Sequence, residues 1–271
     1  MDFAFLDSGT GGLPYMQYLK DSCPKARCIY LADTKNFPYG DKTSDQIVHA
    51  ATTAVDLILS HWNPKTFVLA CNTMSVSALS ELRRIFPEIS FIGTVPAIKL
   101  ATAVTRNKRI GLLATNRTVQ DPYTDNLIRK FASDCTVIRR GDAQLISFIE
   151  HDFFKASEDQ RVDSVRPAVD FFLKNEVDTI ILGCTHFVHV SGYIQKLAGK
   201  NIDVIDSRSG VVRQALKVAF SQNNQQTKPV VDEPHDRSFF VTSLSNNTEA
   251  KLYERICFEM DIPWGGVLGG A

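Results

Sequence analysis

Short apolar runs alternate with helical patterns through most of this 271-residue chain. The runs are almost continuously apolar, as expected of strands that are buried on both faces of a parallel sheet. Between them, apolar residues recur at helical spacing, most clearly over Ser44–Trp62, where Thr43 and Gln46 form a capping-box pattern. This alternation predicts an α/β fold with mostly parallel sheets. The predicted strands span residues 3–6, 28–31, 66–70, 90–93, 109–114, 136–139, 179–182 and 203–205.

Two pairs of segments indicate an internal repeat. Residues 66–73 (TFVLACNT) and 179–186 (TIILGCTH) both read threonine, two apolar residues, leucine, a small residue, cysteine and two polar residues. Residues 5–10 (FLDSGT) and 112–117 (LLATNR) also match, and the offsets nearly agree: 114 − 7 = 107 and 184 − 71 = 113. Such self-similarity predicts two related halves. We expect residues 1–96 plus 208–271 to form one α/β lobe and residues 97–207 the other.

The repeat gives Cys71 and Cys184 equivalent places at the carboxyl ends of two predicted strands. Ligands of open α/β sheets bind at those ends. Two pseudo-symmetric lobes that face each other would place the thiols on opposite walls of one cleft, where we expect the active site. One thiolate could then remove a proton from a carbon while the other thiol delivers one to the opposite face. Each cysteine precedes an expected helix N-terminus, whose partial positive charge favours a thiolate.

Composition excludes several classes of protein. Lys plus Arg equals Asp plus Glu at 30 each, and no basic cluster suggests nucleic-acid binding. No apolar run reaches the roughly 18 residues of a membrane helix, and the first residues lack the basic region of a secretory signal. The six cysteines include no CxxC pair, so we expect reduced thiols in a cytoplasmic protein. The expected partner is a small molecule or a second copy of the chain.

Two residues beside the expected strand ends could move protons. Asp7 ends the first strand within DSGTGG, where it could bind an ammonium group, assist a proton transfer or cap a turn. His186 follows Cys184 by two positions and could act as its base or be a structural histidine. Glu150 lies in an apolar helical pattern, where it could be a solvated helix residue or part of the site. Neutral donors for a substrate carboxylate are available from Asn72, Thr73 and Thr185.

At these residues the chain resembles the glutamate racemases. The resemblance is carried by DSGTGGLPY, YLADTKNFPYG, PKTFVLACNT, VPAIKLA and GCTHF, with DS at 206–207, in the family's order over most of residues 1–210. It implies a cytoplasmic, homodimeric isomerase that interconverts L- and D-glutamate without a cofactor or a metal. It also implies two pseudo-symmetric α/β domains and a role in cell shape and cell-wall biogenesis, in which D-glutamate is supplied for peptidoglycan synthesis.

The resemblance also implies roles for the matching residues. Cys71 and Cys184 correspond to the two acid/base residues, Asp7 to the residue that assists Cys71, and His186 to the residue that assists Cys184. The other matches are Ser8, which with Asp7 lies near the amino group, Tyr39 and Gly40 on the side-chain side, Asn72, Thr73 and Thr185 at the α-carboxylate, Glu150 as a further acidic residue, and Thr115 and Thr118 in a pocket loop.

The chain departs from the family's pattern in two places. Phe187–Val188 stands where the family commonly has tyrosine and proline, and the part after Ser221 has no close match. In that part we expect a polar surface connection over 221–234, a strand at 238–242, a helix at 249–260 and a loosely held glycine-rich tail.

Four alternatives remain open at this point. The chain could be a racemase of another acidic amino acid such as aspartate, or a non-catalytic ligand-binding protein. A thiol hydrolase built on Cys184 and His186 would form an acyl-enzyme and would not need Cys71. A zinc site from the same three residues lacks standard spacing and a fourth ligand.

Overall fold

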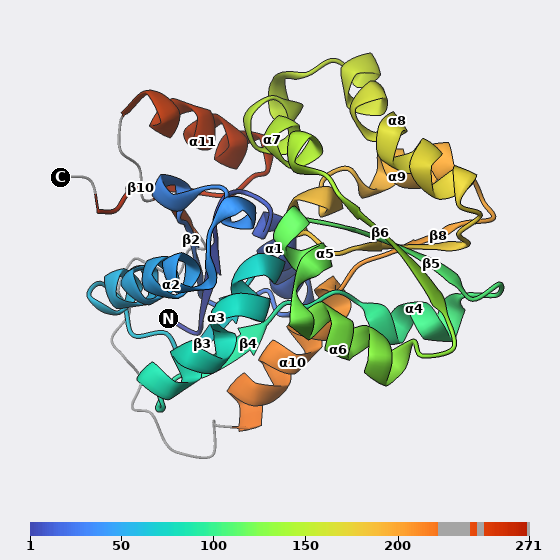
Figure 1. Ribbon diagram of the computed structural model, residues 1–271. Helices are drawn as coiled ribbons and strands as arrows, with labels where there is room; N and C mark the ends of the chain where they lie inside the picture. Colours follow the sequence, from blue (N-terminus) through green and yellow to red (C-terminus); the bar gives the residue numbers. More distant parts are fainter. Residues whose placement is uncertain (222–238, 243–246, 270–271) are drawn as a thin grey trace. The chain divides into compact units, whose positions relative to one another are not determined.

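The computed structural model describes residues 1–221, 239–242 and 247–269 (Figure 1). The chain forms two compact units, Met1–Thr94 with Arg208–Ala271 and Val95–Ser207. Within the described residues, no helix combines the length and the apolar character that crossing a membrane requires.

Each unit is built on one parallel sheet, which confirms the predicted α/β fold. The first sheet has the order β10-β9-β2-β1-β3-β4 and the second β6-β5-β7-β8. The strands of the first unit are β1 (Phe3–Asp7), β2 (Cys28–Ala32), β3 (Thr66–Leu69), β4 (Ser90–Gly93), β9 (Phe239–Thr242) and β10 (Trp264–Val267). Those of the second are β5 (Arg109–Ala114), β6 (Thr136–Gly141), β7 (Thr179–Leu182) and β8 (Asp203–Ile205).

Helices cover both faces of the first sheet. One face buries alternate strand residues such as Leu6 and Leu69 against α2 (Ser44–Leu59) and α3 (Asn72–Ile85). The other face meets α1 (Leu13–Ser22) and α10 (Arg208–Ser221), which also pack on each other. The predicted capping box between Thr43 and Gln46 is present at the start of α2, which ends three residues before the expected Trp62.

The second sheet is covered in the same way. Its first face packs on α4 (Ile98–Val104) and α6 (Pro122–Phe131), and its other face meets α8 (Glu158–Lys174), which packs on α9 (Ser191–Ala198). Gly111 of β5 lets Phe172 of α8 approach closely, since a Cβ there would lie 2.6 Å from its ring. The shorter elements are α5 (Asn116–Gln120), α7 (Ala143–His151), and the single-turn helices η1 (Thr34–Asn36), η2 (Tyr39–Asp41), η3 (Phe153–Lys155) and η4 (Thr185–Val188).

The two sheets repeat one topology. The order β2-β1-β3-β4 corresponds to β6-β5-β7-β8. The residues that precede the two strand-end cysteines, Ala70 and Gly183, donate equivalent backbone hydrogen bonds to Leu6 (2.8 Å) and Leu113 (2.7 Å). The sequence repeat is therefore a repeat of strand order and register.

The last helix of each half packs in the other unit. Helix α4 follows β4 in sequence but belongs to the second unit, where it lies against α6, β7 and β8. Helix α10 follows β8 but belongs to the first unit, where it lies against α1, β3 and β4. The partners of α4 and α10 are equivalent in the repeat, so the halves exchange one helix each.

The C-terminal segment corrects one expectation. The predicted strand and helix are present as β9 and α11 (Asn247–Glu259), but the tail is not loosely held throughout. Trp264–Val267 forms β10, which pairs in parallel with β9. Backbone hydrogen bonding does not require an apolar pattern, so the glycine-rich sequence concealed this strand. The expected surface connection spans residues 221–234, and all of it after Ser221 lies outside the described residues.

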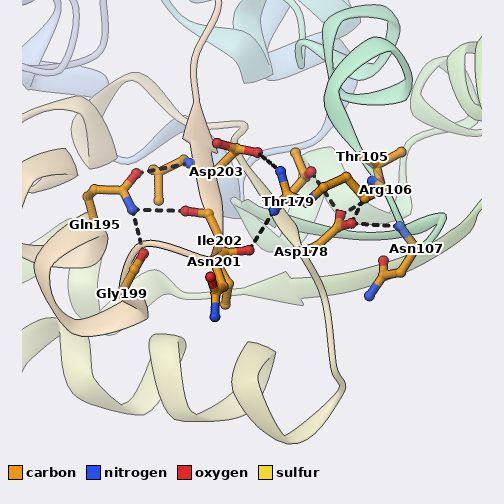
Figure 2. A network of polar contacts seen from close by, with 11 residues as sticks. Thr105, Arg106, Asn107, Asp178, Thr179, Gln195, Gly199, Asn201, Ile202 and Asp203 are labelled. Atoms are coloured by element: carbon orange, nitrogen blue, oxygen red, sulfur yellow. Dashed lines mark hydrogen bonds and ion pairs between the residues drawn. The ribbon is translucent and has the colours of Figure 1, made fainter.

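A network of hydrogen bonds and ion pairs connects segments at the amino-terminal edge of the second sheet (Figure 2). The Asp178 carboxylate accepts hydrogen bonds from Thr105 Oγ1 (2.6 Å), Arg106 N (2.6 Å), Asn107 N (2.7 Å) and Thr179 Oγ1 (3.0 Å). Burial alone would raise the pKa of Asp178, and these hydrogen bonds together lower it below its ordinary value. Asp178 thus holds the turn before β5 against the start of β7.

We expect Asp178→Asn to lower the free energy of unfolding by about 1.5–3 kcal/mol, the range for a lost hydrogen bond to a charged group. Because the folded-state pKa of Asp178 is depressed, its contribution is present above the ordinary value of 3.8 and is lost as pH falls through the folded-state pKa. Urea unfolding of both proteins at neutral and acidic pH measures this. Asp203→Asn is the control, because the half-exposed pair of Asp203 with Arg106 should contribute less than about 1 kcal/mol. Equal losses in the two variants would contradict this role.

Candidate active site

Cys71 is the N-cap of α3. Strand β3 ends at Leu69, and the Cys71 Sγ accepts a hydrogen bond from Met74 N at 3.5 Å. The side chain is buried, and α3 is 14 residues long. The thiol therefore lies at the positive end of a full helix dipole, as the sequence led us to expect.

Asp7 lies on the neighbouring strand at the same sheet edge. It is the last residue of β1, which pairs with β3 through Leu6 and Leu69. The Asp7 side chain is fully buried, and its Oδ1 accepts hydrogen bonds from Ser8 N (2.6 Å) and Ser8 Oγ (3.3 Å). The carboxylate and the thiol thus extend from adjacent strand ends.

Tyr39 belongs to the same cluster. Its hydroxyl donates to Asp33 Oδ2 at 2.5 Å, and Asn36 Nδ2 donates to both Asp33 oxygens at 3.0 Å. Burial, followed by the charge of Asp33 and the hydrogen bond to it, raises the pKa of Tyr39 well above 10, and Cys71 and Asp7 add to the effect. Burial also raises the pKa of Asp33, although the hydrogen bonds from Tyr39 and Asn36 oppose it. Tyr39 therefore stays a neutral hydrogen-bond donor at neutral pH.

Asp33 is a site residue that was not predicted from the sequence. The signal was available, because Asp33 directly follows β2 as Asp7 ends β1, and Asp33 N donates to Asp7 O at 2.8 Å. Strand-end aspartates on two neighbouring parallel strands must lie close together. Through its hydrogen bonds with Asn36 and Tyr39, Asp33 holds the turn that contains Tyr39 and Gly40.

The first turn of α3 contains the buried side-chain amide of Asn72. Neither Asn72 Nδ2 nor Oδ1 has a hydrogen-bond partner among the described residues, although the side chain is only 2% exposed. An unsatisfied buried polar group costs about 1–3 kcal/mol. Thr73, the next residue, is also buried. The amide of Asn72 is therefore available to a ligand beside Cys71.

In the second unit, Cys184, His186 and Glu150 form a chain of contacts. Cys184 Sγ lies 3.6 Å from His186 Nδ1, and His186 Nε2 lies 3.0 Å from Glu150 Oε2. Glu150 comes from α7 and is fully buried, so its interpretation as a solvated helix residue is wrong. Cys184 precedes the single-turn helix η4, so the expected full helix N-terminus is found only at Cys71. At Cys184 the neighbouring His186 side chain takes the place of the helix N-terminus.

The His186 imidazole lies between two groups that favour its protonated form. Burial alone would lower the pKa of His186, but the hydrogen bonds and charges of Cys184 and Glu150 outweigh it and raise the pKa well above 6.5. These two neighbours therefore favour the protonated imidazole, which lies between the thiol and the carboxylate. It can stabilise a negative charge on Cys184 Sγ.

The remaining predicted residues follow the same sheet edges. Thr115 is the N-cap of α5, where its Oγ1 accepts from Thr118 N and donates to Thr118 Oγ1, both at 2.9 Å. Thr185 is buried in η4. The structure thus gathers the predicted residues into two clusters, one in each unit: Asp7, Ser8, Tyr39, Gly40, Cys71, Asn72 and Thr73, and Thr115, Thr118, Glu150, Cys184, Thr185 and His186.

Both clusters contain side chains that are able to exchange protons, including a thiol in each. All six cysteines are free thiols. Within the part of the chain that the structure describes, no group of three or more His, Cys, Asp or Glu side chains is arranged to hold a metal ion.

Comparisons with known proteins identify the family of this chain. Residues 15–215 match the family described as Asp/Glu/Hydantoin racemase. A glutamate racemase of Treponema pallidum is 38% identical over 98% of this chain and 96% of its own length, and one of Haemophilus influenzae is 34% identical over 91% and 90%. The crystal structure of Escherichia coli glutamate racemase, solved with L-glutamate and the activator UDP-MurNAc-ala, superimposes with a TM-score of 0.83 at 26% identity, covering 98% of this chain and 97% of that one. The chain therefore belongs to the Asp/Glu/hydantoin racemase family and, within it, to the glutamate racemases.

Proposed function

We propose that this protein interconverts L- and D-glutamate by a cofactor-independent mechanism in which Cys71 and Cys184 act as the two acid/base residues. One observation carries the proposal: the repeat provides one thiol at the same strand end of each unit. Each thiol also has its own ionisable neighbours, Asp7 for Cys71 and the His186–Glu150 pair for Cys184. The relatives named glutamate racemase support glutamate as the substrate.

In the proposed mechanism the two thiols act on opposite faces of the same Cα. Cys184 removes the proton from L-glutamate while Cys71 delivers a proton to the other face, and the roles reverse for D-glutamate. His186 is protonated beside Cys184, so it balances the charge when this thiol acts as a thiolate. Asp7 serves the Cys71 side in the corresponding way.

The other residues of the clusters bind the substrate in this proposal. Asn72 is the best supported, because its buried amide has no partner in the described residues. A substrate carboxylate would accept hydrogen bonds from the N–H groups of this amide. Binding would therefore remove the free-energy cost of leaving these groups buried without a partner. We assign the remaining residues as follows: Thr73 and Thr185 to the α-carboxylate, Asp7 and Ser8 to the ammonium, Tyr39 and Gly40 to the side chain, and Thr115 and Thr118 to the pocket wall.

We also propose a physiological setting for the reaction. The product D-glutamate would supply peptidoglycan synthesis and so support cell-wall biogenesis and cell shape. We expect a cytoplasmic homodimer. The relatives named glutamate racemase support only the reaction on which this setting depends.

A second candidate follows from the Cys184–His186–Glu150 chain. A thiol, an imidazole and a carboxylate in hydrogen-bonding sequence also occur in thiol hydrolases. Such an enzyme would form an acyl-cysteine at Cys184 and would not use Cys71. An aspartate racemase would use both thiols but prefer the shorter substrate.

Incubation with each enantiomer of glutamate in D₂O, without pyridoxal phosphate and with a chelator, tests the main proposal. We expect deuterium at Cα, first in the product enantiomer, because separate thiols remove and deliver the proton. Parallel incubations with L- and D-aspartate test the choice of substrate. Absence of exchange with both glutamate enantiomers would refute the function. Formation of an acyl-enzyme from activated esters, without any exchange, would favour the hydrolase.

A further inference from the structure

Tyr30 joins two backbone groups of one loop. It lies in β2 and is fully buried. Its hydroxyl accepts a hydrogen bond from Gly12 N at 2.9 Å and donates one to Gly9 O at 2.7 Å. Both glycines belong to the glycine loop, residues 8–12, which connects the end of β1 to the start of α1. A single side chain thus fixes both halves of this loop.

The loop is also wedged against the strand end that carries Cys71. A Cβ on Gly12 would lie 2.6 Å from the Ala70 Cβ and 2.8 Å from the Tyr30 hydroxyl oxygen. Ala70 directly precedes Cys71 and is bonded through its N–H to Leu6 O. The glycine loop is therefore held between the Tyr30 hydroxyl and the residue before the thiol.

In the second unit, Arg139 occupies the strand position equivalent to Tyr30 and also holds the segment that follows the first strand. Tyr30 pairs with Phe5 in the first sheet, and Arg139 pairs with Leu112, the repeat equivalent of Phe5, in the second. Arg139 Nη1 donates to Val119 O at 2.8 Å and so ties down α5, the segment that follows β5. In both halves, this strand position anchors the chain that leaves the first strand.

We propose that Tyr30 is a positioning residue that sets the place of the Asp7 carboxylate relative to the Cys71 thiol. Asp7 and Ser8 begin the loop that the Tyr30 hydroxyl holds, and the far end of that loop rests on Ala70. This inference rests on the proposed function, in which Asp7 assists Cys71. It predicts that Tyr30 matters for the half-reaction that Cys71 begins and not for the one that Cys184 begins.

Racemisation rates cannot distinguish the half-reaction that Cys71 begins from the one that Cys184 begins. The equilibrium constant between enantiomers is unity, so kcat/KM must change equally in both directions. Elimination of HCl from the D- and L-configured isomers of threo-3-chloroglutamate requires only the first deprotonation. The ratio of the two eliminations, measured on one sample, is independent of the folded fraction of a variant.

For Tyr30→Phe we expect elimination from the D-configured isomer to fall about tenfold and that from the L-configured isomer to stay within about twofold. Misplacement of a catalytic group by about 1 Å can cost up to about 10² in rate. Gly12→Ala, which displaces the same loop from the other side, should shift the ratio in the same direction. In an Asp7→Asn background, Tyr30→Phe should cause no further loss, because Tyr30 acts through Asp7. Tyr193→Phe, which removes a hydroxyl bonded to exposed Glu158, should leave the ratio unchanged.

Equal losses with both isomers, or full additivity with Asp7→Asn, would show that Tyr30 only stabilises the fold and would overturn the inference. An unchanged ratio in Tyr30→Phe would overturn it as well. Failure of the proposed function gives a different result in the same assay, since Cys71→Ser and Cys184→Ser would then not show opposite losses.

Discussion

Replacement of Cys184 by serine is expected to abolish elimination from L-configured threo-3-chloroglutamate and to preserve elimination from the D-configured isomer, and Cys71→Ser is expected to do the reverse. Serine keeps the shape of the side chain but holds its proton far more tightly than a thiol. Racemisation requires both groups, so it should fall by about 10² to 10⁴ in each variant, the range for general acid–base catalysis.

Cys135→Ser is the matched control for these variants. Cys135 is a partly exposed thiol in the turn before β6, outside both clusters, and its replacement should leave both eliminations and racemisation unchanged. If Cys71→Ser racemises glutamate at the wild-type rate, the hydrolase based on Cys184 becomes the better account. If each cysteine variant loses both eliminations equally, the thiols do not act on opposite faces of one carbon.

The second large effect is expected at His186. His186→Asn removes the imidazolium that lies 3.6 Å from Cys184 Sγ, and we expect racemisation and elimination from the L-configured isomer to fall by about 10². Elimination from the D-configured isomer should change much less, because Cys71 begins it. His189→Asn removes an imidazole three residues further on and is the control. Steady-state rates of racemisation in both directions and of the two eliminations test this prediction. Equal losses in the two histidine variants would contradict a specific role of His186 beside Cys184.

Glu150→Gln should change the pH dependence of the same half-reaction. The hydrogen bonds and charges of Cys184 and Glu150 raise the pKa of His186 well above 6.5, so the wild-type imidazole stays protonated at neutral pH. The His186–Glu150 pair contributes stability that is fully present below pH 6.5, the ordinary pKa of histidine. This stability is lost as pH rises through the raised pKa of His186. Without the carboxylate charge the pKa falls, and the alkaline limb of L-configured elimination should move to lower pH. Glu158→Gln, at an exposed glutamate, should leave this limb in place.

Local sequence patterns were sufficient for the strands and for the ends on which the thiols lie. A buried parallel strand is almost entirely apolar, so the change to polar residues at Cys71 and Cys184 marks each end. The capping box of α2 was equally visible, because its two partners are three residues apart. These features depend on contacts that are close in sequence.

Features that depend on distant contacts could not be predicted in this way. Glu150 is buried because it meets His186, which is 36 residues away. Tyr30 holds Gly9 and Gly12 from the next strand, and its own sequence context is that of any buried strand residue. Strand β10 pairs with β9 although its own sequence is rich in glycine. In each case the structural role depends on a partner that is distant in sequence, so the residue's own neighbours in the sequence do not reveal it.

The exchange of α4 and α10 also bears on how such a chain could have originated. A single half made as a separate polypeptide would have its own strands, but its last helix would not pack on its own sheet. Two copies would therefore have to exchange that helix, as in a domain-swapped dimer. Joining two copies end to end turns the exchange into an intramolecular one and frees each copy to diverge. The differences between the two clusters, a long helix and Asp7 at one thiol and an imidazolium with Glu150 at the other, are the kind of divergence that fusion permits.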